Sequence, residues 1–375
     1  MYKILVVFGT RPEAIKMAPL IKELRTKPDF KVIVCVTAQH REMLDQVLDI
    51  FNIVPDYDLN IMSSNQSLIK ITTLVLAGID KIIDEEQPNL VIVHGDTTTT
   101  LSTSLATFYN KIKLVHIEAG LRTYNKYFPY PEEINRQITS LLSDYHFAPT
   151  NLNKTNLIKE GIKKDNIFVT GNTVIDALKI TVKDDYEHKI LDELTNKRLI
   201  LVTVHRRENL GKPMADIFKA IKKITEEYED ILVVFPVHLN PKVREIAHEI
   251  LNNHSRIKLI EPLSVIDFHN FMAKSYLILT DSGGIQEEAP SLKIPVLVLR
   301  NETERKEGLK AGTIKLIGTD YNNVYKSIKN ILDNKKEYKK MTKAINPYGD
   351  GNASKKIVEI IDEIYSGYKV YNDID

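Results

Sequence analysis

Residues 279–313 read LTDSGGIQEEAPSLKIPVLVLRNETERKEGLKAGT, and the order of elements in this segment indicates the fold class. An apolar run, Tyr276–Leu279, ends in Thr280 and Asp281 and is followed by a glycine-containing turn and a segment that favours helix. A second apolar run, Pro295–Leu299, comes almost at once, so the order is strand, glycine turn, short helix, strand. Glycines let a ligand approach the backbone, and a helix start offers unpaired N–H groups and a positive dipole end. The corner is therefore a candidate diphosphate site, although a plain glycine-rich turn would explain it in isolation.

Short apolar runs alternate with helix-period segments along the whole chain. The runs in the first half are Lys3–Phe8, Lys31–Thr37, Asn89–His94, Lys113–Ile117, Tyr145–Pro149 and Ile167–Val169. After a charge-rich gap the series restarts with Leu199–Val204, Ile231–Pro236, Ile257–Ile260, Tyr276–Leu279, Pro295–Leu299 and Thr313–Ile317. Apolar runs between amphipathic helices are typical of parallel strands that are buried on both faces. Two such series predict an α/β fold with two Rossmann-like, doubly wound domains.

The chain has 375 residues, which is enough for two domains of ordinary size. We expect an N-terminal domain over residues 1–172 and a C-terminal, nucleotide-binding domain over residues 173–352, because the gap between the two series is rich in charge and has no strand signal. The final helix, from about residue 353 to residue 375, is expected to pack back on the first domain.

The composition is that of an ordinary globular protein, with 43% hydrophobic and 27% charged residues. A net charge of +1 gives no general attraction to nucleic acid or to a membrane, so neither is expected as a partner. The chain has a single cysteine, Cys35, which excludes a disulfide framework. Because Cys35 lies in an apolar run, we expect a buried thiol. The N-terminal apolar run is too short for a signal peptide, and no run approaches about 18 apolar residues, so a cytoplasmic location is expected.

Polar and charged side chains follow the predicted strands, at the edge where open α/β sheets bind ligands. In the first half they are Arg11, Lys16, Asp96, Glu118, Glu132 and Arg136. In the second half they are His205, Arg206 and His238, with Arg300 and Arg305 in a polar loop that can reach back over the glycine corner. Each has a plain alternative: Asp96 as a helix cap, Glu132 as a complement to a helix dipole, His205 as an ordinary cleft histidine. Their joint occurrence at strand ends favours a site with chemistry.

Three other signals resemble ligand sites, and we reject each. Residues 349–354, GDGNAS, follow coil and lack the third glycine of a dinucleotide-binding turn. His248 and His254 are six residues apart, which does not place them on one helix face for zinc. Residues 56–58, DYD, are predicted to be a solvated loop rather than a metal site. No metal site is therefore expected.

Several motifs carry a resemblance to a known family: GTRPEAIKMAPL, HGDTTTT, HIEAGLRT, PYPEEINRQ, TGNTVIDAL, VTVHRRENLG and the stretch from DSGG to KAGT. Through them the sequence resembles the non-hydrolysing UDP-N-acetylglucosamine 2-epimerases over essentially its whole length. The resemblance implies GT-B architecture, in which two Rossmann-like domains lie around a central cleft, and usually a homodimer. Neither a metal ion nor an organic cofactor is expected, because Arg11, Lys16, Arg305 and the helix start supply positive charge.

The resemblance also implies roles for single residues. A nucleotide-diphosphate site would be formed by Arg11, Lys16, Ser282, Gly283, Gly284, Glu288 and Arg305. Within it, Glu288 would hold the ribose hydroxyls, and Phe268 would help to enclose the base. A reaction centre would be formed by Asp96, Glu118, Glu132 and His205, with Arg136 in support. Which carboxylate is the base and which is the acid stays open.

The implied reaction is the reversible epimerisation of UDP-N-acetylglucosamine to UDP-N-acetylmannosamine. The hydrogen on sugar carbon 2 is not next to a carbonyl, so its direct removal would be prohibitive. Expulsion of UDP from carbon 1 makes that proton removable and leaves a 2-acetamidoglucal, to which UDP then adds back. Inversion favours two proton-transfer groups on opposite faces of the sugar. The alternatives are a hydrolysing 2-epimerase, a GT-B glycosyltransferase that uses a UDP-sugar, and a catalytically dead sensor, which the intact carboxylates disfavour.

A second molecule of UDP-N-acetylglucosamine is a further expected partner, because bacterial members of the family resemble one another in binding it as an activator. The matching positions are Gln39, Glu132, Arg206 and His238. Position 65 departs from the pattern, since it is Asn65 where many bacterial members carry an arginine. Loss of one charged hydrogen bond is expected to weaken activator binding by about 1–3 kcal/mol.

Overall fold

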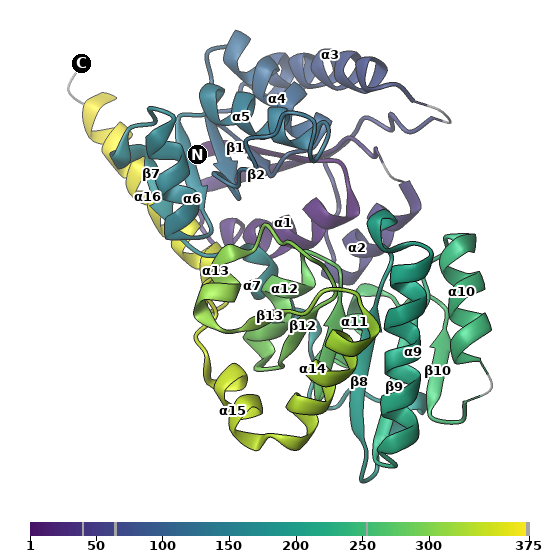
Figure 1. The fold of residues 1–375 in the computed structure, drawn as a ribbon. Helices are drawn as coiled ribbons and strands as arrows, with labels where there is room; N and C mark the ends of the chain where they lie inside the picture. The colour runs from purple at the N-terminus through teal and green to yellow at the C-terminus, as the bar shows by residue number, and fades with distance from the viewer. Residues whose placement is uncertain (40, 64–65, 253, 373–375) are drawn as a thin grey trace. The chain divides into compact units, whose positions relative to one another are not determined.

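The structure, a computed structural model, describes residues 1–39, 41–63, 66–252 and 254–372, and its packing divides this chain into two compact units. Unit 1 comprises Met1–Ala177 and Tyr348–Asp375, and unit 2 comprises Leu178–Pro347. The chain therefore passes from unit 1 to unit 2 after Ala177 and returns before Tyr348. Both units alternate strands and helices, as Figure 1 shows.

The described part of unit 1 contains a seven-stranded parallel sheet with the order β3-β2-β1-β4-β5-β6-β7. Its strands are β1 (Tyr2–Phe8), β2 (Phe30–Val36), β3 (Tyr57–Asp58), β4 (Leu90–His94), β5 (Lys113–Ile117), β6 (Tyr145–Ala148) and β7 (Ile167–Val169). Its helices are α1 (Arg11–Leu24), α2 (Arg41–Phe51), α3 (Leu68–Glu86), α4 (Thr98–Tyr109), α5 (Glu132–Leu142), α6 (Asn151–Lys159) and α16 (Ala353–Asn372), with a 3₁₀ turn at Lys164–Asn166. The strand order reverses between β1 and β4, which creates a ligand-binding switch point at their carboxyl ends.

The described part of unit 2 contains a six-stranded parallel sheet with the order β10-β9-β8-β11-β12-β13. Its strands are β8 (Arg198–Thr203), β9 (Ile231–Pro236), β10 (Ile257–Ile260), β11 (Leu277–Thr280), β12 (Val296–Val298) and β13 (Ile314–Leu316). Its helices are α8 (Lys189–Asp192), α9 (Lys212–Glu227), α10 (Pro241–Leu251), α11 (Val265–Ala273), α12 (Ile285–Glu288), α13 (Lys306–Ala311), α14 (Tyr321–Asp333) and α15 (Lys335–Lys343), with 3₁₀ turns at Arg207–Asn209 and Ala289–Leu292. Helix α7 (Thr173–Thr181) contains the first passage between the units.

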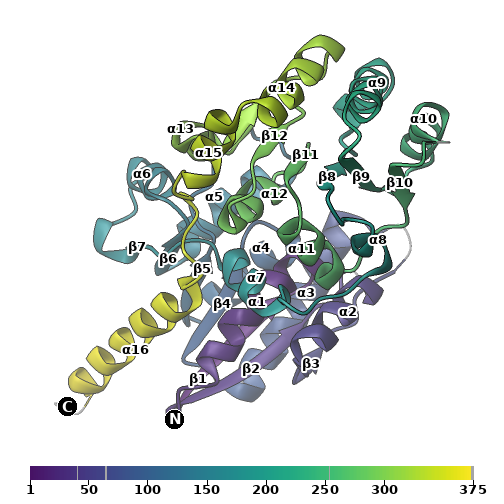
Figure 2. The same ribbon diagram turned by 90° about the horizontal axis from the view of Figure 1, so that it is seen from below.

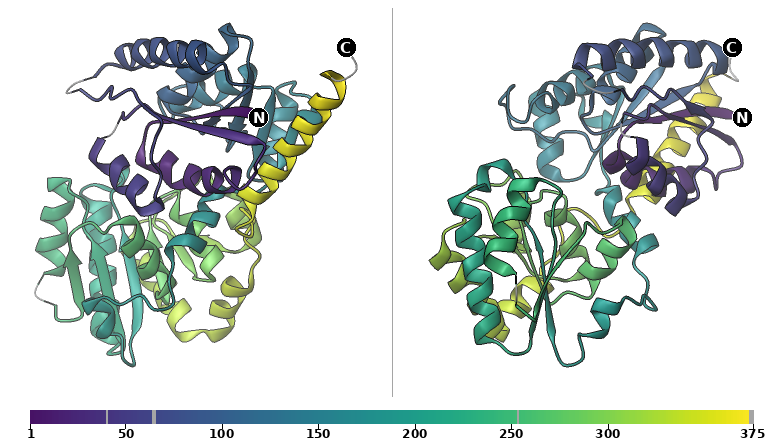
Figure 3. Two further views of the ribbon diagram at one scale, coloured as in Figure 1. Left: turned by 180° about the vertical axis from the view of Figure 1, so that it is seen from behind. Right: turned by 90° about the vertical axis from the view of Figure 1, so that its right-hand side faces the viewer.

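Both faces of the unit 2 sheet are buried, which explains why its strands are continuous apolar runs. Alternate strand residues such as Val233 and Phe235 pack beneath α9 and α14, whereas Leu232 and Val234 pack on the opposite side. Figure 3 shows the helices on both sides of this sheet.

Helix α16 lies against α1 of unit 1, as Figure 2 shows. The ring of Tyr365 lies 4.7 Å from that of Tyr2, and Lys27 donates to Asp362 at 2.6 Å. These contacts hold α16 against unit 1, next to the start of β1.

The prediction of an α/β, doubly wound fold is confirmed, and all twelve predicted strands are present with ends that differ by no more than one residue. The prediction of a solvated loop at residues 56–58 is wrong. Tyr57 and Asp58 form β3, which pairs with Cys35 and Val36 of β2. A two-residue edge strand is too short to show a hydrophobic period, so the sequence pattern missed it. Cys35 is a fully buried free thiol, as predicted, and burial raises its pKa to about 12.

Two features are absent from the described residues. No group of three or more His, Cys, Asp or Glu side chains among them is placed to hold a metal ion. No helix formed by these residues is both long enough and apolar enough to cross a bilayer.

Candidate active site

Glu118 follows β5 directly and is the centre of a polar cluster in unit 1. Its Oε2 accepts hydrogen bonds from Lys16 Nζ and from Asn172 Nδ2, the latter at 2.9 Å, and lies 3.5 Å from His94 Nε2. Burial alone would raise the pKa of Glu118, but the charges of Lys16 and His94 hold that pKa well below its usual value. The side chain is therefore a partly buried anion, 14% exposed, with a positive partner. Its backbone φ of +63° is uncommon for a residue other than glycine and is typical of functional sites.

Asp96, which follows β4 and Gly95, is bound by Arg136. Its Oδ2 accepts from Arg136 Nε at 2.8 Å and lies 2.7 Å from Arg136 Nη2. Asp96 does not cap α4, because the Oγ1 of Thr97 accepts the N–H of Thr100 and performs that role. The alternative in which Asp96 serves only as a helix cap is therefore wrong.

Helix α5 begins with two glutamates in different surroundings. Glu133 is fully buried and accepts from the N–H groups of Thr123 and Tyr124, each at 2.9 Å, and from Arg136 Nη1 at 3.1 Å. Burial opposes ionisation of Glu133, but these hydrogen bonds hold its pKa below the usual value. Glu132 is half-buried, and its Oε2 has no hydrogen-bond partner among the described residues. Glu133 thus fixes Arg136, whereas Glu132 keeps an oxygen for a ligand.

Glu13 is a functional-region residue that sequence reasoning missed. It is 2% exposed and accepts from the N–H groups of Gly9 at 3.0 Å and Thr10 at 2.8 Å, and from the hydroxyls of Thr97 at 2.8 Å and Thr100 at 3.2 Å. It therefore ties the turn after β1 to the turn after β4. The spacing of Thr10 and Glu13 is that of a capping box, which was the available signal.

Three further predicted residues belong to this unit. Arg11 is the first residue of α1 and is half-buried, and burial lowers its pKa. Gln39 lies near the end of β2, where its Oε1 accepts the hydroxyl of Thr99 at 3.4 Å. Asn65 lies outside the described residues.

The predicted glycine corner of unit 2 joins β11 to the short helix α12. A Cβ on Gly283 would lie 3.3 Å from the guanidinium carbon of Arg305, so the arginine covers the turn closely. Arg305 is oriented by Glu287, which accepts its Nε–H at 2.7 Å. Gln286 is fully buried and donates to the carbonyl of Ser282 at 3.0 Å, which supports the turn from below. The corner therefore combines small residues, a fixed backbone and a cation.

Arg300 does not reach over this corner, contrary to the prediction. It is 5% exposed and donates to Glu208 at 3.0 Å and to Glu304 at 3.1 Å. Two carboxylates bind its guanidinium, so Arg305 alone of the two loop arginines lies against the glycines.

His205 follows β8 and is held close to the same corner by Asp281. The buried Oδ2 of Asp281 accepts the N–H groups of His205 at 2.9 Å and Arg206 at 2.8 Å and the side-chain amide of Asn209 at 3.0 Å. The imidazole stacks on His238 at 5.3 Å with an interplanar angle of 19°. Burial lowers the pKa of His205, against the opposing charge of Asp281, and His238 and Arg206 lower it further. These surroundings therefore favour the neutral imidazole.

Glu288 and Phe268, predicted to bind the nucleoside, are linked through α11. His269 Nε2 lies 3.7 Å from Glu288 Oε2, and its Nδ1 is 2.7 Å from the hydroxyl of Thr181. A Cβ on Gly284 would lie 3.2 Å from Glu288 Oε1, so this carboxylate lies against the glycine corner. Phe268 is half-buried and packs against the core of unit 2.

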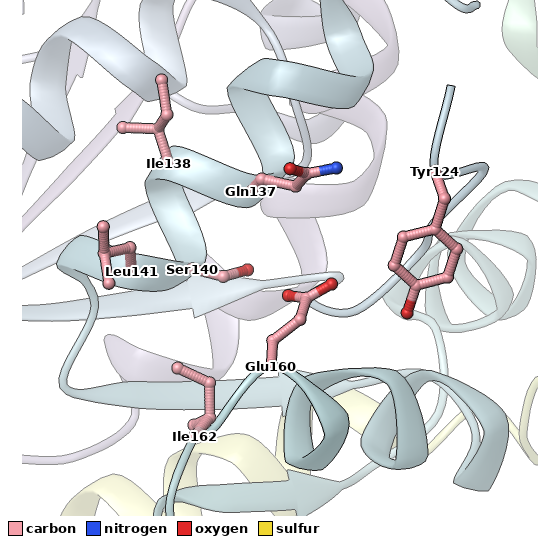
Figure 4. A pocket seen from close by; sticks show the side chains of 7 residues that line it. All are labelled: Tyr124, Gln137, Ile138, Ser140, Leu141, Glu160 and Ile162. Carbon is pink, nitrogen blue, oxygen red and sulfur yellow. The ribbon is translucent and has the colours of Figure 1, made fainter. Parts of the chain in front are cut away.

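The described residues of unit 1 also form a cavity of about 510 Å³, shown in Figure 4. It is lined by Tyr124, Gln137, Ile138, Ser140, Leu141, Glu160 and Ile162. Predicted reaction-centre residues do not line it. Gln137 donates to Glu133 at 3.0 Å, so α5 presents Gln137 to the cavity and Arg136 to Asp96.

Comparison with known proteins gives a consistent result. A family model described as UDP-N-acetylglucosamine 2-epimerase matches residues 22–362. The UDP-N-acetylglucosamine 2-epimerase of Bacillus subtilis (strain 168) is 60% identical over 357 residues, which cover 95% of this chain and 94% of the relative.

Solved structures agree with the sequence comparison. A crystal structure of a UDP-N-acetylglucosamine 2-epimerase has a TM-score of 0.90 at 57% identity and covers 98% of this chain and 97% of its own. The Neisseria meningitidis UDP-GlcNAc 2-epimerase, solved bound to UDP-GlcNAc, has a TM-score of 0.87 at 50% identity and covers 96% of this chain and 100% of its own.

Proposed function

The chain belongs to the UDP-N-acetylglucosamine 2-epimerase family and has its GT-B-like fold, and on that premise we propose that it interconverts UDP-N-acetylglucosamine and UDP-N-acetylmannosamine by expelling UDP and adding it back. The observation that carries this proposal is the pair of carboxylates after β4 and β5. Asp96 and Glu118 are each held by a cation, Arg136 and Lys16, through one carboxylate oxygen. Two fixed anions at neighbouring strand ends suit a reaction that moves a carbon-bound proton.

The first step, expulsion of UDP, requires stabilisation of a departing diphosphate. In this proposal the backbone of Ser282, Gly283 and Gly284 and the guanidinium of Arg305 receive it, with Arg11 and Lys16 as further cations. Glu288 would hold the ribose and Phe268 would help to enclose the base. The neutral imidazole of His205 donates a hydrogen bond in this scheme and adds no charge.

The second step removes the proton from carbon 2 and returns one to the opposite face. We assign Glu118 the role of base, because it is ionised at neutral pH and its Oε2 is held in place by Lys16 and Asn172. Asp96 and Glu132 are the remaining carboxylates of the proposed centre. Exclusion of water protects the glycal during this interval, since hydrolysis would otherwise release the free sugar.

Incubation with UDP-N-acetylglucosamine in heavy water tests the proposal directly. We expect NMR to show UDP-N-acetylmannosamine with deuterium at carbon 2 and no accumulation of free N-acetylmannosamine. Free sugar and UDP as the end products would identify a hydrolysing enzyme instead. A product that fully retains the original hydrogen would contradict elimination with solvent exchange.

We also propose that UDP-N-acetylglucosamine acts at a second site as an activator. Arg206 follows His205 in the chain and His238 stacks on the His205 ring, whereas Gln39 comes after β2 and Glu132 begins α5. Asn65 in place of an arginine reduces the charge available to a second diphosphate. The expected consequence is activation that requires more ligand than in an arginine-bearing relative.

A homodimer is the oligomer that we propose. Exposed apolar side chains occur on α4 and α5, two helices in contact: Phe108, Tyr109, Ile138 and Leu141. Burial of such side chains in an interface between copies would be favourable. Light scattering after size-exclusion chromatography tests this, and a mass of one chain would contradict it.

A further inference from the structure

Asn172 lies between β7 and α7, shortly before the chain passes from unit 1 to unit 2. It is 3% exposed. It belongs to the motif TGNTVIDAL, to which the sequence assigned no chemical role.

The polar groups of Asn172 make contacts in three directions. The backbone N–H donates to the carbonyl of Tyr348 at 2.7 Å, in the segment that has just returned from unit 2. The side-chain Oδ1 accepts the N–H of Val174 at 3.1 Å, in the first turn of α7. The side-chain Nδ2 donates to Glu118 Oε2 at 2.9 Å. The N–H of Val174 needs an acceptor and the carboxylate of Glu118 needs a donor. The side-chain amide of Asn172 is therefore oriented with Oδ1 toward Val174 and Nδ2 toward Glu118.

The outgoing and returning segments are bound to each other around Asn172. Gly171 and Gly349, with φ of +93° and +122°, pack backbone against backbone. A Cβ on Gly171 would lie 3.1 Å from the carbonyl oxygen of Tyr348, so a side chain does not fit there. In the next turn, Asp176 accepts the N–H groups of Ala353 at 3.2 Å and Ser354 at 2.7 Å. The segments next to both passages between the units are thus bound to each other in one junction in unit 1.

We propose that Asn172 is a positioning residue that ties the carboxylate of Glu118 to this junction. The inference rests on the proposed role of Glu118 in the epimerisation. Among the described residues, the charged or titratable groups in contact with Glu118 are Lys16 from α1 and His94 from β4, and Asn172 adds a neutral donor. Through this donor, Asn172 sets the orientation of the carboxylate relative to the backbone that joins β7 to α7.

The substitution Asn172→Asp tests the proposal, because it retains the size of the side chain and an oxygen for Val174 but removes the donor to Glu118. We expect kcat to fall about 10- to 100-fold, as for loss of a hydrogen bond to a charged group, with little change in KM. The acidic limb of the kcat profile should move to higher pH, because a second carboxylate beside Glu118 opposes its ionisation. Lys16 and His94 remain and limit the size of that movement.

Asp176→Asn is the matched control, because it weakens the same junction without contact to Glu118. We expect this variant to have a lower melting temperature. Its kcat should stay within a few-fold of the wild-type value, and the acidic limb of its kcat profile should not move. Equal losses of kcat in both variants, with unchanged acidic limbs, would show that Asn172 acts only through stability.

A double variant with Glu118→Gln provides the second measurement. If Asn172 acts through Glu118, Asn172→Asp should lower kcat by less than about threefold in the Glu118→Gln background. Both changes then act on the same hydrogen-bonded pair, so their effects are not independent. Fully multiplicative losses would overturn the inference. A wild-type protein without epimerase activity would contradict the proposed function instead, whereas an active wild type with an unaffected Asn172→Asp variant would contradict only the role of Asn172.

Discussion

Replacement of Glu118 by glutamine removes the charge at the centre of the unit 1 cluster and preserves its shape. The anion lies against Lys16 and His94, and both lower its pKa. If it takes the proton from carbon 2, turnover should fall about 100-fold or more, the usual scale for acid–base groups. That loss corresponds to about 2.7 kcal/mol of transition-state stabilisation. UDP affinity should change much less, because the diphosphate is assigned to other residues.

The same substitution should reduce stability in a pH-dependent way. Lys16 and Asn172 both donate to Glu118 Oε2, and a hydrogen bond to a charged group contributes about 1.5–3 kcal/mol. Glutamine keeps an acceptor oxygen, so we expect a loss of about 1–3 kcal/mol of unfolding free energy near pH 7. The pKa of Glu118 in the folded state lies well below its usual value, so this contribution is present above the usual pKa and is lost as the pH falls through the folded-state pKa. The difference between variant and wild type should therefore shrink in acid.

Steady-state kinetics measures turnover, calorimetric titration with UDP measures its affinity, and urea unfolding measures the free energy of unfolding. Glu160→Gln is a suitable control, because Glu160 also binds a buried cation, Arg122, at 2.8 and 2.7 Å. It should lose stability but retain kcat within a few-fold. Near-normal turnover of the Glu118→Gln variant would refute its assignment to the reaction centre. A proportional loss of turnover in both variants would attribute the effect to general destabilisation.

Three further outcomes are expected. Arg305→Ala should weaken UDP binding about 10- to 100-fold, because the guanidinium covers Gly283, while an unchanged dissociation constant in calorimetry would remove Arg305 from the diphosphate site. Turnover should persist in EDTA, because Arg11, Lys16 and Arg305 supply the positive charge, and a full loss that a divalent ion restores would contradict this. The reverse reaction, from UDP-N-acetylmannosamine alone, should be slow until UDP-N-acetylglucosamine is added as activator. If the reverse reaction ran at full speed from the first seconds while its product, UDP-N-acetylglucosamine, was continuously removed, the activator proposal would be contradicted.

The sheets could be predicted from sequence because each strand carries its own signal. Runs such as Leu199–Val204 and Ile231–Pro236 are apolar on both faces, and their bounds follow from local composition alone. β3 lacked this signal because its two residues form a strand only through pairing with Cys35 and Val36. Local pattern therefore predicts the elements that bury much apolar surface and misses those that a neighbour induces.

The candidate site was less predictable where long-range partners decide a role. Arg300 and Arg305 lie in one polar loop, and the sequence pattern predicts the same position over the glycine corner for both. Arg300 is bound by Glu208, which is 92 residues away, whereas Arg305 is bound by Glu287 beside the glycine corner. Asn172 and Glu118 are 54 residues apart, and neither sequence motif identifies the other as its partner.

In unit 1, hydrogen bonding distinguishes Glu118 and Asp96 from the supporting carboxylates Glu13 and Glu133. Glu13 binds two backbone N–H groups with Oε2 and two hydroxyls with Oε1, and Glu133 likewise uses both oxygens. Glu118 and Asp96 differ, because the hydrogen bonds and ion pairs that the described residues make to them fall on Oε2 and Oδ2 respectively. A carboxylate that is bound at both oxygens is held rigidly but has few lone pairs left for a substrate. A carboxylate that is anchored at one oxygen is oriented equally well and retains the other for proton transfer, which is why these two residues suit chemistry and Glu13 and Glu133 suit support.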